Sequence, residues 1–189
     1  PAVASIDVTV HKPHAPIVVA FADVSVSISR VRATDNGRTA EKHAIHNAVV
    51  ALGGNVGEVE STLRAAVREI DALLGTQVTG ISPDFLNAVV ELGTTMGSHE
   101  LLAALQNIEA NHGRIRENHW DSRPLDLDII DFDGITSADP DLALPHPRAW
   151  QRAFVLAPWA ALNPNAKLAG AHEGPVADLL AAAPDRNAV

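Results

Sequence analysis

Two segments near the start of the chain alternate between apolar and polar residues. Ile6, Val8 and Val10 follow this pattern over residues 5–11, and a second alternating run spans residues 23–31. A period of two buries one face of a strand and leaves the other face in water, so both segments are predicted to be strands. Two strands alone are marginally stable, so we expect this part to need a partner sheet that the sequence does not contain.

A polar stretch without periodicity, RATDNGRTAEKHAIHN, follows over about residues 32–47. It contains Asn-Gly, a pair typical of turns. The pattern predicts a linker over residues 33–47, between a first part at residues 1–32 and a domain at residues 48–189.

The remaining chain interleaves strand-like and helix-like patterns. One helix is predicted from Leu63, Val67, Ile70 and Leu74 on one face, and another from apolar positions at 101, 102, 105 and 108, ending near Gly113. A shorter helix is predicted at residues 176–183. Strands are predicted at residues 48–52, 78–81, 85–92, 125–132 and 152–157. Such interleaving indicates an α/β or α+β class.

Composition narrows the function classes. The 189 residues carry a formal net charge of −9, which disfavours nucleic acid as a partner because phosphate contacts require a basic face. No apolar run reaches the roughly 20 residues that a membrane-spanning helix needs, so no membrane association is expected. Cysteine is absent, which excludes disulfides and thiolate chemistry and fits a cytoplasmic location.

Asp126 and Asp128 lie two residues apart in the predicted strand LDLDI. Their side chains therefore point to the same face, where two carboxylates repel unless a cation lies between them. A hard divalent ion such as magnesium, bridging to phosphates, satisfies this arrangement. A solvated strand face with alternating acids is the alternative, and it is favoured for an isolated Asp-x-Asp.

Arginines flank this pair. Arg114, Arg116 and Arg123 precede the strand, and Arg148 and Arg152 follow it. A guanidinium grips phosphate with a planar fork, and phosphoryl transfer depends on positioning, metal and positive charge. The alternative is that these arginines pair with the acidic surface, which is less fitting for several of them together.

Around the paired aspartates and the flanking arginines, the sequence strongly resembles the 6-hydroxymethyl-7,8-dihydropterin pyrophosphokinase family. The matching segments run in order over about residues 48–165: ALGGNVGEVESTL, PDFLNAVVEL, ELLAALQNIEANHGRIRENHW, SRPLDLDII, LALPHPRAWQRAFVLAPW and ALNP. The resemblance implies a ferredoxin-like α+β fold and transfer of pyrophosphate from magnesium ATP to the pterin alcohol, with AMP as the second product.

The resemblance also implies roles for individual residues. Asp126 and Asp128 would hold two magnesium ions, Arg114 and Arg123 would contact the transferred phosphates, and Glu109 would support the arginines. Residues expected to contact ATP are Gln106, Arg116, His119, Trp120, Ile129, His146 and Arg152. Residues expected to contact the pterin are Gly53, Phe85, Asn87, Trp120 and Phe154.

Two of these positions also carry information of their own. Asn87 lies in an apolar strand, where a buried amide needs hydrogen-bond partners such as a pterin edge. Gly53, Gly54 and Gly57 lack the Lys-Ser/Thr of a P-loop, so they predict a strand-to-helix turn lining the pterin pocket and not a phosphate cradle.

One segment departs from the family pattern. The family has about a dozen residues between the strand ending near Ser82 and the one beginning Pro83-Asp84-Phe85, and they form a loop over the pterin. Here Ser82 is followed directly by Pro83. Either the loop is deleted, or the printed sequence omits it, and the close match of the flanking segments favours omission. A true deletion would favour a nucleotide-binding module without catalysis.

The first part resembles a different family, the C-terminal end of dihydroneopterin aldolase. VTVHKPHAPI and FADVSVSISR match the last two strands of that family, and Lys12 falls at its catalytic lysine. A surface charge at a strand end is the alternative for Lys12. The resemblance implies a bifunctional fusion that would also cleave dihydroneopterin if the whole aldolase domain were present, and a homo-oligomer formed through that domain.

Overall fold

The computed structural model of the chain describes residues 5–11, 25–31, 44–82, 87–114 and 123–188. Two compact units can be distinguished, Pro1–Lys42 and His43–Val189, and each is described by itself. In the first unit, β1 (Ser5–His11) pairs antiparallel with β2 (Ser25–Val31), so that Ser5 lies opposite Val31 and His11 opposite Ser25. The two strands predicted from alternation are therefore present, and Lys12 lies outside the described residues.

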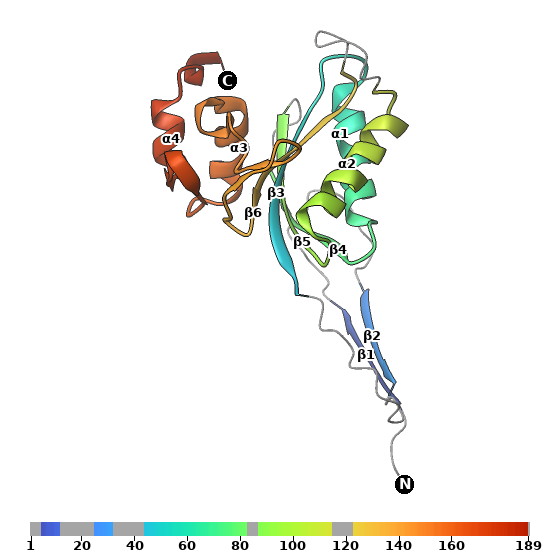
Figure 1. Ribbon diagram of the computed structural model, residues 1–189. Coiled ribbons are helices and arrows are strands. Elements are labelled where there is room, and N and C mark those ends of the chain that lie inside the picture. The colour runs from blue at the N-terminus through green and yellow to red at the C-terminus, as the bar shows by residue number, and fades with distance from the viewer. Residues whose placement is uncertain (1–4, 12–24, 32–43, 83–86, 115–122, 189) are drawn as a thin grey trace. The chain divides into compact units, whose positions relative to one another are not determined.

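The second unit is built on a four-stranded antiparallel sheet with the strand order β4-β5-β3-β6. Along the chain the elements alternate as β-α-β-β-α-β, which makes the unit α+β, as expected. In Figure 1, α1 and α2 lie on one side of this sheet and α3 on the other. The elements of this unit are β3 (His46–Gly53), α1 (Val59–Asp71), β4 (Thr76–Ile81), β5 (Asn87–Thr94), α2 (Ser98–Asn111) and β6 (Asp126–Phe132).

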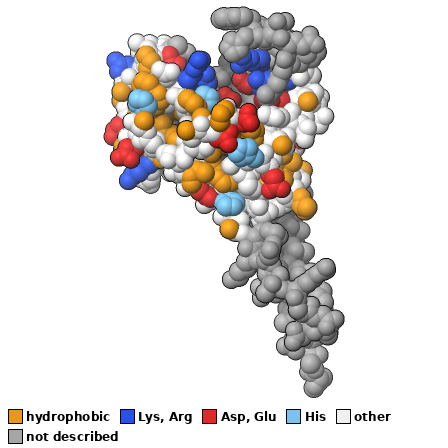
Figure 2. Space-filling view, viewed as in Figure 1, with side chains coloured by type: hydrophobic (Ala, Val, Ile, Leu, Met, Phe, Trp, Pro, Cys, Tyr) orange, Lys and Arg blue, Asp and Glu red, His pale blue; other side chains and the backbone are white. Residues whose placement is uncertain are grey.

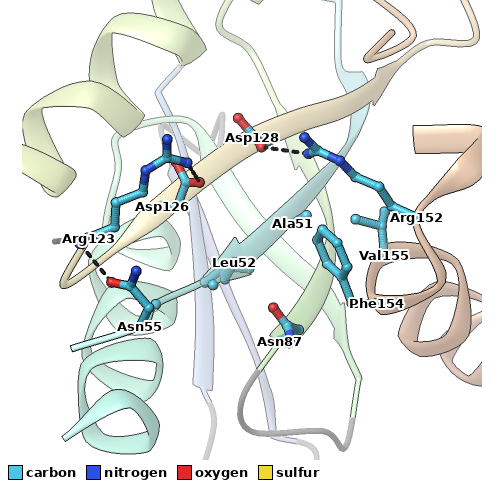
Figure 3. A pocket seen from close by; sticks show the side chains of 12 residues that line it. Ala51, Leu52, Asn55, Asn87, Arg123, Asp126, Asp128, Arg152, Phe154 and Val155 are labelled. Carbon is cyan, nitrogen blue, oxygen red and sulfur yellow. Dashed lines mark hydrogen bonds and ion pairs between the residues drawn. The ribbon is translucent and has the colours of Figure 1, made fainter. Parts of the chain in front are cut away.

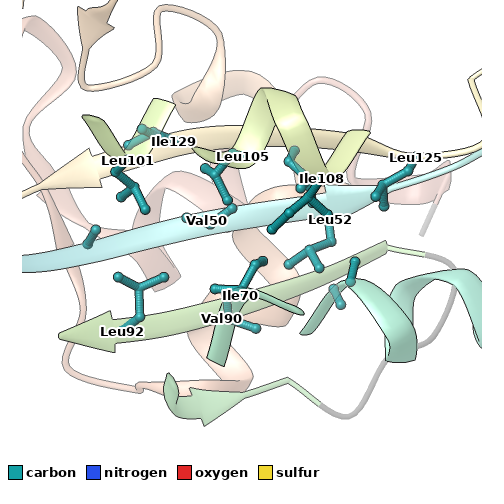
Figure 4. Close-up of a cluster of buried hydrophobic side chains, with 14 of the residues drawn as sticks. Val50, Leu52, Ile70, Val90, Leu92, Leu101, Leu105, Ile108, Leu125 and Ile129 are labelled. Atoms are coloured by element: carbon teal, nitrogen blue, oxygen red, sulfur yellow. The ribbon is translucent and has the colours of Figure 1, made fainter. Parts of the chain in front are cut away.

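Helices α1 and α2 cover the sheet because each presents one apolar face to it. Helix α1 buries Leu63, Ala66 and Ile70, and α2 buries Leu101, Leu105 and Ile108. These side chains form one buried cluster with Val50, Leu52, Val90 and Leu92 of the central strands. Figure 4 shows this cluster, with Ile70 of α1 and Leu101, Leu105 and Ile108 of α2 beside the strands. Leu74 was predicted on the inner face of the first helix. That prediction is wrong, because α1 ends at Asp71 and Leu74 is 91% exposed.

The opposite face of the sheet is covered by α3 (Ala153–Leu162), and α4 (Val176–Ala182) packs against α3. A strand was predicted at residues 152–157, and the structure corrects this to a helix. The segment is apolar on nearly all sides because it is buried between the sheet and α4, so it shows no helical period. One polar anchor fixes α3 to the sheet: the Glu91 carboxylate accepts hydrogen bonds from Trp159 Nε1 (3.2 Å) and Asn163 Nδ2 (2.9 Å).

Strand β6 contains a β-bulge. Leu127 and Ile129 pair with Leu52 and Val50, but the next residue of β3, Val49, pairs with Asp131. The register therefore shifts by one residue between Val49 and Val50. Ile130 is the extra residue, and it packs into the core on the α3 side. As a result Phe132 faces the α1 and α2 side although it lies three residues beyond Ile129.

Short elements complete the unit. A small hairpin of β7 and β8 follows β6, and β9 and β10 pair antiparallel before α4. None of the described helices has the length and apolarity to cross a bilayer. The bounds of the short elements are β7 (Ser137–Ala138), β8 (Ala143–Leu144), β9 (Lys167–Leu168), β10 (Gly174–Pro175), and the single 3-10 turns Ala149–Gln151, Gly170–His172 and Arg186–Ala188.

Candidate active site

A cavity of about 240 Å³ opens beside the end of β3 on the face of the sheet that carries α3. Strands β3, β5 and β6 and the first turn of α3 contribute to its wall. Seven residues that the sequence predicted for substrate or metal line it: Gly53, Asn87, Arg123, Asp126, Asp128, Arg152 and Phe154. Sequence reasoning did not single out Ala51, Leu52, Asn55 and Val155.

Asp126 and Asp128 share the cavity-facing side of β6. Their register partners on β3 are Gly53 and Ala51, while Leu127 between them points into the α1 and α2 core. The alternation predicted from the sequence is thus confirmed. Figure 3 shows the two carboxylates with a guanidinium beside each, Arg123 at Asp126 and Arg152 at Asp128.

Asp126 is engaged by two arginines. Its Oδ1 accepts a hydrogen bond from Arg114 Nη1, and its Oδ2 accepts one from Arg123 Nη1 at 3.1 Å. Arg114 is mostly buried, with 16% of its side chain exposed, whereas 42% of the Arg123 side chain is exposed. Each oxygen of the Asp126 carboxylate therefore has a positively charged guanidinium as its hydrogen-bond donor.

Glu109 on α2 lies behind Arg114. Its side chain is only 2% exposed, and its Oε1 accepts hydrogen bonds from Arg114 Nη1 and from the Leu127 N–H, the latter at 2.8 Å. A buried carboxylate is costly without such partners. The helix α2 is thereby connected through Glu109 to both the arginine and the strand that carries the aspartates.

Asp128 has looser neighbours. Arg152 Nη1 lies 3.7 Å and His146 Nε2 3.9 Å from its Oδ2, distances that give electrostatic attraction without a hydrogen bond. Burial lowers the pKa of His146 below its ordinary value, and Arg152 and Arg148 lower it further while Asp128 acts in the opposite direction. His146 is therefore neutral near pH 7 and can both donate and accept a hydrogen bond.

The other end of the cavity suits a flat polar ring. Asn87 pairs with Gly53 across β5 and β3, and Phe154 is 36% exposed with the Arg152 guanidinium 5.5 Å from its ring centre. Gly54 lets the turn after β3 lie against the segment before β6, because a Cβ at this position would be only 2.6 Å from the carbonyl oxygen of Pro124. Gly53 and Gly54 thus form a close-packed turn that lines the cavity.

Asn55 is a residue that the sequence did not reveal as part of the site. Its Oδ1 accepts the Arg123 N–H at 2.8 Å, and its own N–H donates to the Arg123 carbonyl at 2.9 Å. These two bonds fix the start of the segment that leads into β6. No local pattern marks an exposed asparagine after two glycines for this role, because its partner lies 68 residues away.

Other predicted residues lie outside the cavity wall. Gln106 is on the exposed side of α2, and the Ile129 side chain is buried under α1 and α2. His146 lines a second hollow of about 570 Å³ beside Trp150 and His172, whose rings stack 3.9 Å apart. Five predicted site residues lie outside the described part of the chain: Lys12, Phe85, Arg116, His119 and Trp120.

The donor set fits magnesium. Asp126 and Asp128 supply hard oxygen ligands, and the described residues contain no cluster of three or more carboxylate or histidine side chains that could enclose an ion. Magnesium is commonly bound by one or two carboxylates together with substrate phosphates. Figure 2 shows basic and acidic side chains close together on the upper part of the drawn face, as expected where a polyanion and cations meet.

Comparison with known proteins identifies the family. A Pseudomonas aeruginosa protein named 2-amino-4-hydroxy-6-hydroxymethyldihydropteridine pyrophosphokinase is 37% identical over 153 residues, covering 74% of this chain and 93% of that protein. A protein of the same name from Bacillus subtilis is 39% identical over 126 residues, covering 60% of this chain and 75% of that protein.

A plant protein is also similar. The mitochondrial folate synthesis bifunctional protein of Arabidopsis thaliana is 38% identical over 125 residues, covering 60% of this chain but 23% of that protein. Residues 49–164 match the family described as 7,8-dihydro-6-hydroxymethylpterin-pyrophosphokinase. The chain therefore belongs to the 7,8-dihydro-6-hydroxymethylpterin pyrophosphokinase family.

Proposed function

We propose that this protein carries out the reaction of its family, in which ATP donates pyrophosphate to 6-hydroxymethyl-7,8-dihydropterin in folate biosynthesis. The observation that supports this most directly is the cavity in which Asp126 and Asp128 face Arg123, Arg152 and Asn87. It combines ligands for a cation, positive charge for phosphates and a polar edge for the pterin.

Asp126 and Asp128 would hold two magnesium ions between the protein and the phosphates of ATP. When bound, magnesium would neutralise negative charge on the phosphate oxygens. Arg123 and Arg152 extend from opposite sides of the cavity, so they can contact phosphate oxygens with charge-assisted hydrogen bonds. Neutral His146 would contact ATP from the Asp128 side.

The pterin would lie between Phe154 and the Gly53 turn, with the Asn87 amide at its edge. Its hydroxymethyl oxygen forms a bond to the β-phosphorus, the bond from that phosphorus to the bridging oxygen of the α-phosphate breaks, and AMP leaves. The arginines stabilise the charge that passes to AMP. Glu109 and Asn55 hold Arg114 and Arg123 in place.

A direct test is AMP release that requires both 6-hydroxymethyl-7,8-dihydropterin and magnesium. We expect no release when either is omitted, and none beyond background after Asp126→Ala or Asp128→Ala. Near-normal turnover in both variants would exclude the metal assignment while leaving the overall reaction intact.

Several finer assignments are proposals that rest on the family resemblance. Arg116, His119 and Trp120 would form a basic loop over ATP, Phe85 would stack on the pterin, and Gln106 and Ile129 would contact ATP. The β-α-β-β-α-β order and antiparallel sheet support a ferredoxin-like arrangement. A cytoplasmic location remains a prediction.

A second candidate function, nucleotide binding without catalysis, applies if the loop after Ser82 is truly deleted. The Ser82 N–H donates to the Val89 carbonyl (2.9 Å), and Ser82 Oγ accepts the Val89 N–H (3.0 Å), so the β4–β5 ladder continues to Ser82, where the family loop would begin. Binding of a non-hydrolysable ATP analogue without AMP formation would support this alternative.

The first unit leads to a separate proposal. The antiparallel pair β1 and β2 is compatible with the last two strands of a dihydroneopterin aldolase, with Lys12 as its catalytic lysine, in a fusion that assembles as an oligomer. The chain as printed would not cleave dihydroneopterin, since most of that domain is absent from it. Glycolaldehyde release by protein of this length would refute this.

A further inference from the structure

Asp126 is occupied by guanidinium groups although its proposed role is to bind a divalent ion. Arg114 takes Oδ1 and Arg123 takes Oδ2, so both oxygens already hold a positively charged donor. Asp128, by contrast, has its nearest cations at 3.7 Å and 3.9 Å. A divalent ion approaching the pair therefore has to compete at Asp126 and not at Asp128.

The two contacts of Arg114 differ in how easily they can be exchanged. Glu109 is 2% exposed and also accepts the Leu127 N–H, so its contact with Arg114 is shielded from ions that enter the cavity. Asp126 is 24% exposed and can accept another cation from the cavity. Arg114 can thus give up Asp126 while remaining bound to Glu109.

We propose that Glu109 is a positioning residue that tethers Arg114 as an internal counter-ion on Asp126, and that Arg114 exchanges this carboxylate for a phosphate oxygen when a divalent ion and a nucleotide bind together. The inference rests on the proposed metal-binding role of Asp126. It assigns Arg114 two successive partners and Glu109 the task of keeping it within reach of both.

Because of this exchange, the affinity for the divalent ion depends on whether a nucleotide is bound, and the reverse also holds. Without nucleotide, no phosphate oxygen replaces the hydrogen bond that Arg114 loses at Asp126, so the ion binds weakly. With a nucleotide triphosphate present, a phosphate oxygen accepts that hydrogen bond. The ion and the nucleotide should therefore bind with positive cooperativity, and this cooperativity should require Arg114.

The test measures Mn²⁺ binding by electron paramagnetic resonance, without nucleotide and with α,β-methylene-ATP. Arg114→Met should tighten Mn²⁺ binding without nucleotide by at least about tenfold, because it removes both a competitor and a nearby positive charge. Arg152→Met, which removes a cation beside Asp128 without removing a hydrogen bond, should tighten it by only about twofold to threefold. Equal tightening in both variants would overturn the exchange and leave a charge effect alone.

Glu109→Gln tests the tether. Its amide oxygen can still accept the Leu127 N–H, and its thermal midpoint is measured to check that the variant remains folded. We expect the enhancement of Mn²⁺ binding by α,β-methylene-ATP to fall several-fold, because Arg114 is no longer held within reach of both of its partners. In Glu109→Gln/Arg114→Met the enhancement should equal that of Arg114→Met alone.

Two further outcomes are decisive. An enhancement by α,β-methylene-ATP that is unchanged in Glu109→Gln would overturn the positioning role. If Asp126→Asn left Mn²⁺ binding unchanged, the metal-binding role of Asp126 would itself be wrong and the exchange with it, even in a protein that still releases AMP.

Discussion

Strand β6 and the turn after it carry two Asp-x-Asp pairs, and the two pairs have different surroundings. Asp126 and Asp128 at the start of the strand face three arginines and a histidine. Asp131 and Asp133 at its end share the spacing but not the cations: the only ion pair described for them joins Asp133 to His46. The spacing of the acids therefore does not by itself distinguish the candidate site from the turn after β6.

The second pair supports the turn after β6. Asp133 has a positive φ of 51° and accepts hydrogen bonds from the Asn47 N–H (2.7 Å) and His46 Nδ1 (2.6 Å). Asp131 Oδ2 accepts the Gly134 N–H at 3.0 Å, while its buried Oδ1 has no partner among the described residues. The difference between the pairs lies in what other segments bring to them.

The largest expected effect separates the pairs by activity. Asp126→Ala and Asp128→Ala should each lower kcat for AMP release by about a thousandfold or more, because the phosphate charge loses its metal ligands. Asp131→Ala should stay within about twofold of the parent protein, since Asp131 is not among the described residues that line the cavity. Comparable losses at Asp128 and Asp131 would break the distinction.

A smaller effect is expected from the cations that mark the first pair. Arg123→Ala and Arg152→Ala should each lower kcat/KM by about 10- to 100-fold, as expected for a lost charge-assisted contact to phosphate. Arg64→Ala on α1 is the matched control, because Arg64 does not line the cavity and its ion pair with Glu60 is exposed. Wild-type kinetics for Arg152→Ala would remove that residue from the proposed ATP site.

Asp133→Ala should affect folding and not catalysis. It removes two hydrogen bonds and places alanine at a positive φ, so we expect unfolding to become easier by about 1–2 kcal/mol. Although burial acts in the opposite direction, the bonds from Asn47 and His46 lower the pKa of Asp133 below 3.8. Its stabilising effect is therefore present above pH 3.8 and fades as the pH falls through the lowered pKa. Urea unfolding across pH 2–7 measures this.

The smallest effect is expected at Asp131. Burial raises the pKa of Asp131 above 3.8, with Asp133 contributing in the same direction against the Gly134 hydrogen bond. A raised pKa means that the favourable contribution is present below pH 3.8 and is lost as the pH rises through the folded value. Asp131→Asn should therefore raise the thermal midpoint by about 1–3 °C at pH 7 and leave it unchanged at pH 3. A lower midpoint at pH 7 would show that the charge is needed.

The sequence predicted those parts that depend on local period or local chemistry. Alternation around Leu127 placed Asp126 and Asp128 on one face, and the apolar spacing of Leu101, Leu105 and Ile108 defined α2. Both patterns arise because one side of the element meets the core. The boundaries were less predictable, since Leu74 belongs to the same apolar series but follows the end of the helix.

The rest depended on tertiary contacts. Helix α3 has no visible period because both of its sides are covered, so its start at Ala153 resembled a strand. The tie between Arg123 and Asn55 joins segments 68 residues apart, and no spacing in the chain encodes it. The position of Glu109 behind Arg114 follows from family resemblance, but its Leu127 contact requires the packed sheet.

The extra residue of the β6 bulge, Ile130, is not needed for the division of β6 into two faces. Without Ile130 the strand would read Asp-Leu-Asp-Ile-Asp-Phe, a strict alternation in which every aspartate and every apolar side chain keeps its present face. The two faces therefore do not require Ile130. Its side chain fills the core on the α3 side, and its carbonyl accepts the His146 N–H at 2.9 Å. One inserted residue thus provides the attachment point for the segment that carries His146 toward Asp128.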